Sequence, residues 1–576
     1  MGLMDVSGII FECTYNLTLV PRDPHRSVSL ARRRRLTALV LAAIACAAFG
    51  IGMTVAVDRA AGSPAQRVAE RYGHDWAAGD YPAMYRLLPP GSRRAVGYVA
   101  FASDYRTAEE IAGVTAITVG PASVSGSVTQ LPMRIRTAIF GTLRLTEKLP
   151  VGHVGTAEFV RWSPALRFPG LIDRQRLFIR LSPVARGRIL AADGGQLSPN
   201  AAGDSPLGAA GATIAGGLAS ASIAERAHGE TSVGVSGLER LYNARLAGRA
   251  PAQLVVAGRV IARSTARAGT TIHTTIEPAL EELAVSLLGA REGGIAVIQP
   301  SIGAVLALAG VALSAAQPPG STFKIITATA ALDAGMVTPQ TTFPVQTGVV
   351  IDGYLLHNAD GEACGGTLTE AFAVSCNSVF APLGARLGAA RLVAEARAFG
   401  FDDPTRRLPD EAQSSIPSAD QIGNSLAVGS SAIGQGRVLA TTLQMATVAA
   451  TIADHGIRAR PRLLAALPLS LHRVTSSQTA GEVRGMMLAV AREGTATAVQ
   501  IPGVPIAAKT GTAELHNSNG LADNPQNDDA WLVAFPAVAN PPVAVGVMLV
   551  GAGAGGSSAA PIARAVLQRV LAMSSP

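Results

Sequence analysis

The chain has 576 residues, of which 48% are hydrophobic and 15% are charged. This length is more than one hydrophobic core usually accommodates, and it predicts roughly three or four domains. The apolar content excludes a disordered chain. The net charge of +8 comes from scattered arginines without an aromatic-rich basic patch. We therefore expect no nucleic-acid partner, and instead a surface that faces an anionic membrane or wall polymer.

The first predicted element is an uncharged apolar run over residues 36–57. It is long enough to cross a bilayer, which takes about 20 residues. The arginines at positions 32–35 predict that residues 1–35 form a short cytoplasmic tail and that everything after Asp58 is exported. The length of the run favours an anchor over a cleaved signal peptide or a lipidated Cys46, and all three alternatives export the body of the protein.

A small α+β domain is predicted over residues 63–175. Its first segment, SPAQRVAERYGHDWAAG, places Val68, Tyr72 and Trp76 near helical spacing behind a serine and a proline, which is typical of an amphipathic helix. The strand-like segments AITV, MRIRTAIFG and TAEFVRW follow. We expect His74 and Trp76 to serve the fold rather than a site.

The next region, residues 183–272, opens with RGRILAAD and then becomes rich in glycine, alanine and serine between Asn200 and Gly237. Such a composition predicts a loose, linker-like module. Order is expected to return with GLERLYNARLAG at residues 237–248, and a helical pattern follows Pro278.

The last domain is predicted over residues 273–576. It begins with two strand-like runs, GGIAVIQP and GAVLALAG, and ends with VPIAAKTGTA, DAWLVAFPA, PVAVGVMLVG and a helical run over residues 559–573. A long, mostly helical block separates the two sets of strands. The pattern predicts an antiparallel sheet built from both ends of an α+β domain, with helices inserted between.

Four cysteines do not make a disulfide scaffold. Cys13 is predicted to be cytoplasmic and Cys46 to lie in the membrane, so only Cys364 and Cys376 could pair in an oxidising exterior. Their spacing permits a bridge without requiring it, and two packed thiols are an equal alternative. No spacing resembles a metal site, and we expect neither a metal nor a cofactor.

Lysine is rare in this chain, which has only Lys148, Lys324 and Lys509. A lysine amine can lose its proton when it is buried, whereas a guanidinium effectively cannot. In PPGSTFKIITATAALDAG, a helix that begins near Pro319 would place Ser321 one turn from Lys324 in an apolar segment. A desolvated lysine can then activate a serine nucleophile. A bare S-x-x-K is nevertheless a weak signal, since a surface lysine behind a helix cap gives the same pattern.

Two further triplets make the signal specific. Ser375-Cys376-Asn377 gives an S-x-N after a helical segment, and Lys509-Thr510-Gly511 gives a K-T-G on a strand. With SCNSVFAPLGARLG, IGQGRVLATTLQMATVAATIADHG, AAKTGTAE and DDAWLVAFP in the same order, the sequence resembles the class B, or monofunctional, penicillin-binding proteins over most of residues 270–572. The segment ending in RWSPALRFPGL is similar to a domain related to nuclear transport factors, and RGRILAADGGQL to the start of the pedestal, or dimerisation, domain.

The resemblance implies a peptidoglycan D,D-transpeptidase that β-lactams acylate. It implies Ser321 as nucleophile, Lys324 as its base, and Ser375, Asn377 and Lys509 as proton-relay and orienting groups. Thr510, Gly511 and Thr512 would bind substrate, and backbone N–H groups of Ser321 and Thr512 would form the oxyanion hole. Implied partners are peptidoglycan stem peptides, β-lactams, the cytoplasmic membrane, a glycosyltransferase, and cell-wall synthesis or division proteins.

Neighbouring residues are expected to play lesser parts. His357, Asn358 and Glu370 are predicted to be loop and helix-surface residues, and Asp529 and Trp531 to support the strand beside the K-T-G. Two other functions remain open. One is a receptor or scaffold that binds β-lactam covalently without turnover, and the other is a β-lactamase or carboxypeptidase in which water replaces the acceptor amine.

Overall fold

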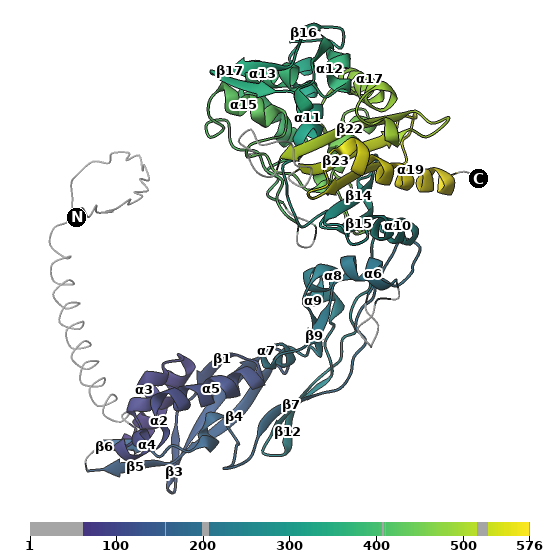
Figure 1. Ribbon diagram of the computed structural model, residues 1–576. Helices are drawn as coiled ribbons and strands as arrows, with labels where there is room; N and C mark the ends of the chain where they lie inside the picture. Colours follow the sequence, from purple (N-terminus) through teal and green to yellow (C-terminus); the bar gives the residue numbers. More distant parts are fainter. Residues whose placement is uncertain are drawn as a thin grey trace, which may run out of the picture. The chain divides into compact units, whose positions relative to one another are not determined.

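The computed structural model describes residues 62–574, apart from 156, 199–204, 206, 406–407, 409–410 and 515–527 (Figure 1). The predicted anchor over residues 36–57, together with Cys13 and Cys46, lies outside the described residues. None of the helices within the described ranges is both long and apolar enough to cross a membrane. The chain forms two compact units, the smaller of which ends at residue 162.

The smaller unit begins with α2 (Pro64–Ala77), the amphipathic helix that the sequence predicts. Ser63 caps it, because its side chain accepts the backbone N–H of Gln66 and the Gln66 side chain accepts the backbone N–H of Ser63. Tyr72 and Trp76 are buried, so both serve the core as expected. Within its described residues, the other helices and strands wholly inside this unit are α3 (Tyr81–Arg86), α4 (Pro90–Val96), β2 (Ser123–Ser125), β5 (Val151–Val154) and β6 (Ala157–Val160).

A four-stranded sheet contains most of the strand-like segments predicted before residue 171. Its order is β1-β3-β2, with β4 also paired to β3. Along β3 the side chains from Thr129 to Thr137 alternate between buried and more exposed positions, which is the period of a strand with one covered face. The bounds are β1 (Val114–Val119), β3 (Val128–Thr137) and β4 (Thr142–Leu149), preceded by α5 (Tyr98–Ala112).

The larger unit contains a second, three-stranded antiparallel sheet in the order β12-β11-β7. Its strands are β7 (Leu177–Leu181), β11 (Ala252–Val256) and β12 (Arg259–Ser264). The predicted RGRILAAD segment supplies β8 (Ile189–Leu190), which pairs in parallel with β13 (Ile272–His273).

A buried ion pair holds this region together. The guanidinium of Arg186 donates to the carboxylate of Glu239 from Nε at 2.8 Å and from Nη2 at 2.5 Å. The side chain of Asn243 accepts Arg186 Nη2 at 2.9 Å and the backbone N–H of Gly234 at 3.0 Å, and it donates to Glu230 at 2.9 Å. These bonds join the start of the region to the segment after the glycine-rich stretch.

The prediction of a loose module between Asn200 and Gly237 is wrong for the described part of that stretch. It folds into α6 (Gly208–Ala215), β9 (Leu218–Ser220), α7 (Ile223–Ala227) and β10 (Ser232–Gly234), followed by α8 (Gly237–Leu241) and α9 (Asn243–Leu246). Ile214 and Ala215 are buried in the core. Small residues here permit close packing rather than looseness, because a Cβ on Gly216 would lie 2.1 Å from the carbonyl oxygen of Ser236.

The C-terminal half is built on a five-stranded antiparallel sheet in the order β15-β14-β24-β23-β22. The strands are β14 (Gly293–Gln299), β15 (Ala304–Gly310), β22 (Ile506–Glu514), β23 (Asp528–Pro536) and β24 (Ala544–Leu549). This arrangement confirms the prediction of one sheet built from both ends of the domain. Every residue of β24 is buried, and so is every residue of β23 except the first. Burial on both faces explains why the sequences of these strands are nearly continuous apolar runs.

The longer helices that pack against this sheet are α10 (Pro278–Leu288), α16 (Thr442–Ala453), α17 (Ser477–Glu493) and α19 (Ala560–Ser574). The inserted block also contains α11 (Lys324–Asp333), α12 (Leu368–Ala373), α13 (Asn377–Leu387), α14 (Ala389–Ala398) and α15 (Ser425–Ala432). The predicted closing helix over residues 559–573 is therefore confirmed as α19.

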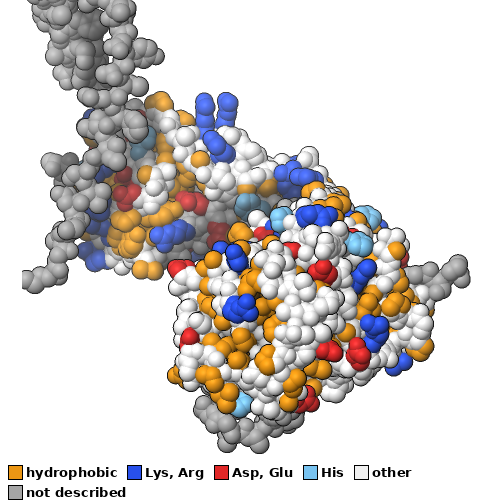
Figure 2. All heavy atoms as spheres, turned by 90° about the horizontal axis from the view of Figure 1, so that it is seen from above, with side chains coloured by type: hydrophobic (Ala, Val, Ile, Leu, Met, Phe, Trp, Pro, Cys, Tyr) orange, Lys and Arg blue, Asp and Glu red, His pale blue; other side chains and the backbone are white. Residues whose placement is uncertain are grey.

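Two pairs of short antiparallel strands lie beside these helices. β16 (Thr342–Gln346) pairs with β19 (Cys364–Thr367), and β17 (Gly348–Ile351) pairs with β18 (Tyr354–His357). On the end of the larger unit that faces the viewer in Figure 2, hydrophobic side chains are interspersed with single charged ones.

Candidate active site

Ser321 lies in a 3-10 turn, η2 (Gly320–Phe323), that runs directly into α11 at Lys324. The predicted helix start near Pro319 is therefore correct. Gly320 has a φ of +50°, and its N–H donates to the carbonyl of Gly434 at 3.0 Å. A Cβ on Gly320 would lie 2.6 Å from the carbonyl oxygen of Thr512. Glycine at this position thus lets the turn that carries Ser321 pack against β22.

Lys324 is completely buried on α11. Its Nζ donates to the side-chain oxygen of Asn377 at 2.6 Å and to the backbone carbonyl of Ser375 at 2.6 Å, and it lies 3.3 Å from Ser375 Oγ. The ring of Phe380 lies 5.7 Å from the same nitrogen. Burial first, and then the charge of Lys509, hold the pKa of Lys324 well below its usual range.

Lys509 on β22 is also completely buried. Its Nζ donates to Ser375 Oγ at 2.8 Å and to the carbonyl of Thr510 at 3.0 Å, and it lies 5.5 Å from the ring of Phe372. Burial lowers the pKa of Lys509 to about 7. Two amines therefore converge on the hydroxyl of Ser375, and burial favours the neutral form of each.

The S-x-N residues form a tight turn between α12 and α13. Ser375 has a φ of +63°, a left-handed conformation that costs a non-glycine residue roughly 1–3 kcal/mol unless the surroundings hold it. The N–H of Ser375 donates to the carbonyl of Phe372 at 3.2 Å, and the N–H of Cys376 donates to the carbonyl of Ala371 at 2.8 Å. The strained turn presents the side chains of Ser375 and Asn377 to Lys324.

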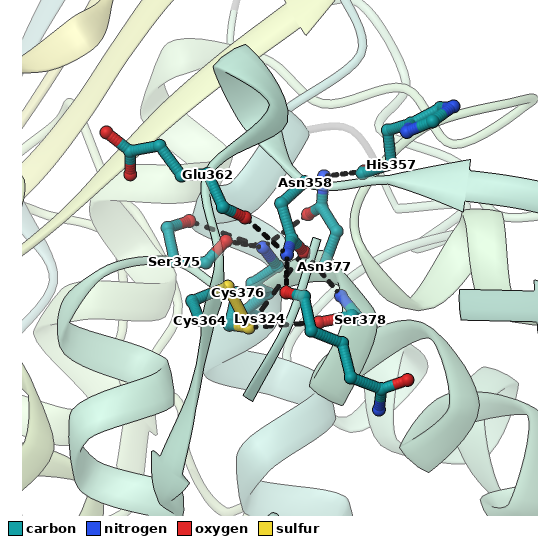
Figure 3. Close-up of a disulfide and its surroundings, with 10 residues drawn as sticks. Lys324, His357, Asn358, Glu362, Cys364, Ser375, Cys376, Asn377 and Ser378 are labelled. Atoms are coloured by element: carbon teal, nitrogen blue, oxygen red, sulfur yellow. Dashed lines mark hydrogen bonds between the residues drawn. A yellow bond between two sulfur atoms is a disulfide. The ribbon is translucent and has the colours of Figure 1, made fainter. Parts of the chain in front are cut away.

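A disulfide joins Cys364 to Cys376, with the two Cα atoms 5.8 Å apart (Figure 3). The sequence left this pairing open between a bridge and two thiols. Cys376 is the middle residue of the S-x-N motif, and Cys364 begins β19. The bridge therefore ties the S-x-N turn covalently to a neighbouring strand.

Asn358 lies in a loop, as predicted, but its side chain is not a surface one, being only 5% exposed. Its Nδ2 donates to the carbonyls of Gln346 at 2.7 Å and Glu362 at 2.9 Å, and its Oδ1 accepts the N–H of Ser378 at 2.8 Å (Figure 3). Sequence reasoning missed this role because it depends on three backbone groups from separate segments. His357 and Glu370 are exposed, as expected.

The K-T-G residues lie on β22, an edge strand of the five-stranded sheet. The hydroxyl of Thr510 lies 2.5 Å from that of Thr495, a partner that the sequence did not indicate. A Cβ on Gly511 would lie 2.7 Å from the carbonyl oxygen of Pro319. Glycine at 511 therefore allows the turn that carries Ser321 to approach the strand closely.

The supporting residues on β23 behave as predicted. Trp531 is opposite Gly511 in the register and is completely buried. The carboxylate of Asp529, also buried, accepts the backbone N–H of Gly551 at 3.1 Å. Both residues stabilise the strand beside the K-T-G.

The structure brings Lys324, Ser375, Asn377 and Lys509 into one hydrogen-bonded network. Among the described residues, no hydrogen bond joins Ser321 Oγ to Lys324, which lies one turn further along the chain. The described part of the chain also contains no group of three or more His, Cys, Asp or Glu residues placed to hold a metal ion. Two buried amines that share one serine hydroxyl, next to the turn that carries Ser321, suit nucleophilic acyl transfer by a serine.

Comparison with known proteins agrees with this chemistry. A family model described as the penicillin binding protein transpeptidase domain matches residues 293–568. The peptidoglycan D,D-transpeptidase PbpA of Mycolicibacterium smegmatis is 34% identical over 365 residues, which cover 53% of this chain and 73% of the relative. PbpA of Mycobacterium tuberculosis is 33% identical over 368 residues, with the same coverage.

Solved structures give the same result. Penicillin-binding protein A from M. tuberculosis as a penicillin G acyl-enzyme complex superposes with a TM-score of 0.55 at 28% identity, covering 68% of this chain and 100% of that one. The D,D-transpeptidase domain of a peptidoglycan glycosyltransferase from Eggerthella lenta gives a TM-score of 0.58 at 26% identity, covering 68% of this chain and 99% of that one.

Proposed function

Since this chain belongs to the penicillin-binding protein transpeptidase family, we propose that it is a peptidoglycan D,D-transpeptidase that works through an acyl-enzyme on Ser321. The observation that carries the proposal is the convergence of two buried lysines on Ser375, beside the turn that holds Ser321.

In the acylation step, Ser321 Oγ attacks the carbonyl carbon of the penultimate D-Ala of a stem peptide. The neutral amine of Lys324 takes the hydroxyl proton, for which its complete burial and lowered pKa prepare it. The C–N bond to the terminal D-Ala then breaks. Ser375 relays a proton to the departing amine, and this role is supported by the short distances from its Oγ to both lysines.

The acyl-enzyme then reacts with an amine from a neighbouring strand, which forms the cross-link and releases Ser321. Asn377 orients Lys324 through its side-chain oxygen and hydrogen-bonds the substrate amide. The backbone N–H groups of Ser321 and Thr512 stabilise the oxyanion, an interaction whose loss typically costs about 3–4 kcal/mol in the transition state. The close contact between the turn and β22 supports this pairing of donors.

Thr510, Thr512 and Lys509 receive the terminal carboxylate of the donor peptide. β22 is an edge strand, so its outer side can accept an extended peptide as an added strand. β-Lactams enter the same site, where opening of the lactam amide by Ser321 gives a stable acyl-enzyme.

The domain assignments are part of the same proposal. Residues 1–35 are a cytoplasmic tail, residues 36–57 a membrane anchor, residues 63–175 a domain related to nuclear transport factors, and residues 183–272 the pedestal. The transpeptidase domain over residues 273–576 then works outside the cytoplasmic membrane. A glycosyltransferase and cell-wall synthesis or division proteins are its partners.

The test is to incubate the full-length chain with a fluorescent penicillin, beside Ser321→Ala, and to follow label retention and cross-linking of stem peptides. We expect stable label that depends on Ser321, together with a cross-linked product. Absence of Ser321-dependent label would refute the covalent mechanism. Rapid loss of label would indicate a β-lactamase, and stable label without any cross-linked product would indicate a receptor or scaffold.

A further inference from the structure

The side chain of Asn358 uses its amide to hold three separate backbone segments. One N–H holds the end of β16 at Gln346, and the other holds the residue after a 3-10 turn at Glu362. Its oxygen accepts the N–H of Ser378 in the first turn of α13. A buried amide with this set of bonds cannot move without leaving its own polar atoms and the buried N–H of Ser378 unpaired, which is costly.

Two residues, Ser378 and His357, link Asn358 to Asn377. Ser378 follows Asn377 in the chain, and His357 precedes Asn358. The backbone carbonyl of His357 accepts the side-chain N–H of Asn377 at 3.2 Å. That bond decides which way the Asn377 amide faces, since it leaves the oxygen directed at Lys324 Nζ, 2.6 Å away. A reversed amide would place an N–H donor against the amine.

We propose that Asn358 is a positioning residue for the transpeptidase reaction, because it fixes the turn that carries Ser375 and the orientation of the Asn377 amide. The inference rests on the function proposed above. Figure 3 shows the labelled side chains of Asn358 and Asn377 and the disulfide around the same turn. The disulfide holds Cys376 from β19, and Asn358 holds the other end of the turn at Ser378. Restraints of this kind keep Ser375 in its left-handed conformation.

The test compares acylation of the full-length chain by a fluorescent penicillin in wild type, Asn358→Ala and Asn358→Asp. Rates are expressed per folded molecule and separated into the acylation rate constant and the noncovalent dissociation constant. For Asn358→Ala we expect the rate constant to fall about 10- to 100-fold, because small misplacements of reacting groups cost that much. The dissociation constant should change little, since the side chain of Asn358 is buried and its amide is bonded to three backbone groups.

Asn358→Asp keeps the shape of the side chain and the oxygen that accepts Ser378, but it loses at least one of the two donors. We therefore expect a rate constant between those of wild type and Asn358→Ala. The matched control is Asn243→Ala in the region around Arg186, where an asparagine side chain also makes three hydrogen bonds. Its loss should lower stability without changing the acylation rate constant of the folded molecules.

The outcomes separate the inference from the proposed function. An unlabelled wild-type chain would refute the proposed function itself. A labelled wild type together with a folded Asn358→Ala that is acylated within about twofold of the wild-type rate would overturn the inference alone. If neither Asn358 variant folds while Asn243→Ala does, Asn358 serves folding only, and the inference is again wrong.

Discussion

Removal of the Cys364–Cys376 disulfide should lower the stability of the transpeptidase domain by about 3 kcal/mol. The two residues are 12 positions apart, and the loop-closure relation for a cross-link of that length gives this value. For a domain of this size the loss corresponds to a fall in Tm of roughly 5–10 °C. The perturbation is the double variant Cys364→Ala/Cys376→Ala, which avoids leaving one free thiol.

The measurement is scanning calorimetry of the full-length chain, in which acylation by penicillin shifts the transition of the transpeptidase domain and thereby identifies it. Wild type treated with a thiol reductant should approach the double variant. The variant retains Cys13 and Cys46, so any effect of the reductant through those residues would appear there as well. Equal Tm values for oxidised wild type and the double variant would refute the reasoning that the bridge stabilises the turn.

Four further variants test other parts of the structure. The proposed role of Lys509, which is to bind the substrate carboxylate, needs the charged amine, whose pKa is about 7. The second-order rate constant of acylation should therefore fall as the pH rises through about 7. In Lys509→Arg, which stays charged, this fall should vanish, and a fall that persists in the variant would exclude the role. Gly511→Ala places a Cβ 2.7 Å from a backbone oxygen and should cost about 1–3 kcal/mol in urea unfolding. Gly485→Ala, at an open position of α17, should instead stabilise the chain by about 0.5–1 kcal/mol. Arg186→Ala leaves the buried Glu239 unpaired and should cost about 3–5 kcal/mol in the same assay, without altering the acylation rate of folded molecules.

Much of the fold could be predicted because many of its helices and strands have recognisable local sequence patterns. Ser63 and Pro64 mark the start of α2, and β14, β15, β22, β23 and β24 are apolar runs of strand length. The described part of the stretch between Asn200 and Gly237 was predicted wrongly for an equally physical reason. The composition of this stretch shows that large side chains are rare. It does not show that glycine allows two backbone segments to pack closely, as those at Gly216 and Ser236 do.

The sequence by itself determined which residues form the candidate site, because S-x-x-K, S-x-N and K-T-G occur in order and in the expected elements. The rarity of lysine marked Lys324 and Lys509 as special, and both are completely buried. Only the tertiary structure decided how these groups meet. Lys509 and Ser375 are 134 positions apart in the chain, yet their side chains lie within 2.8 Å.

For the same reason, the sequence could not predict the bridge at Cys376 or the role of Asn358. Each depends on where a residue distant in the chain comes to lie, and local residue patterns contain no such information. The local sequence around a cysteine or an asparagine does not show which residues its side chain contacts in the folded chain. The tertiary structure supplies the partners, and the partners give these residues their effect on the catalytic turn.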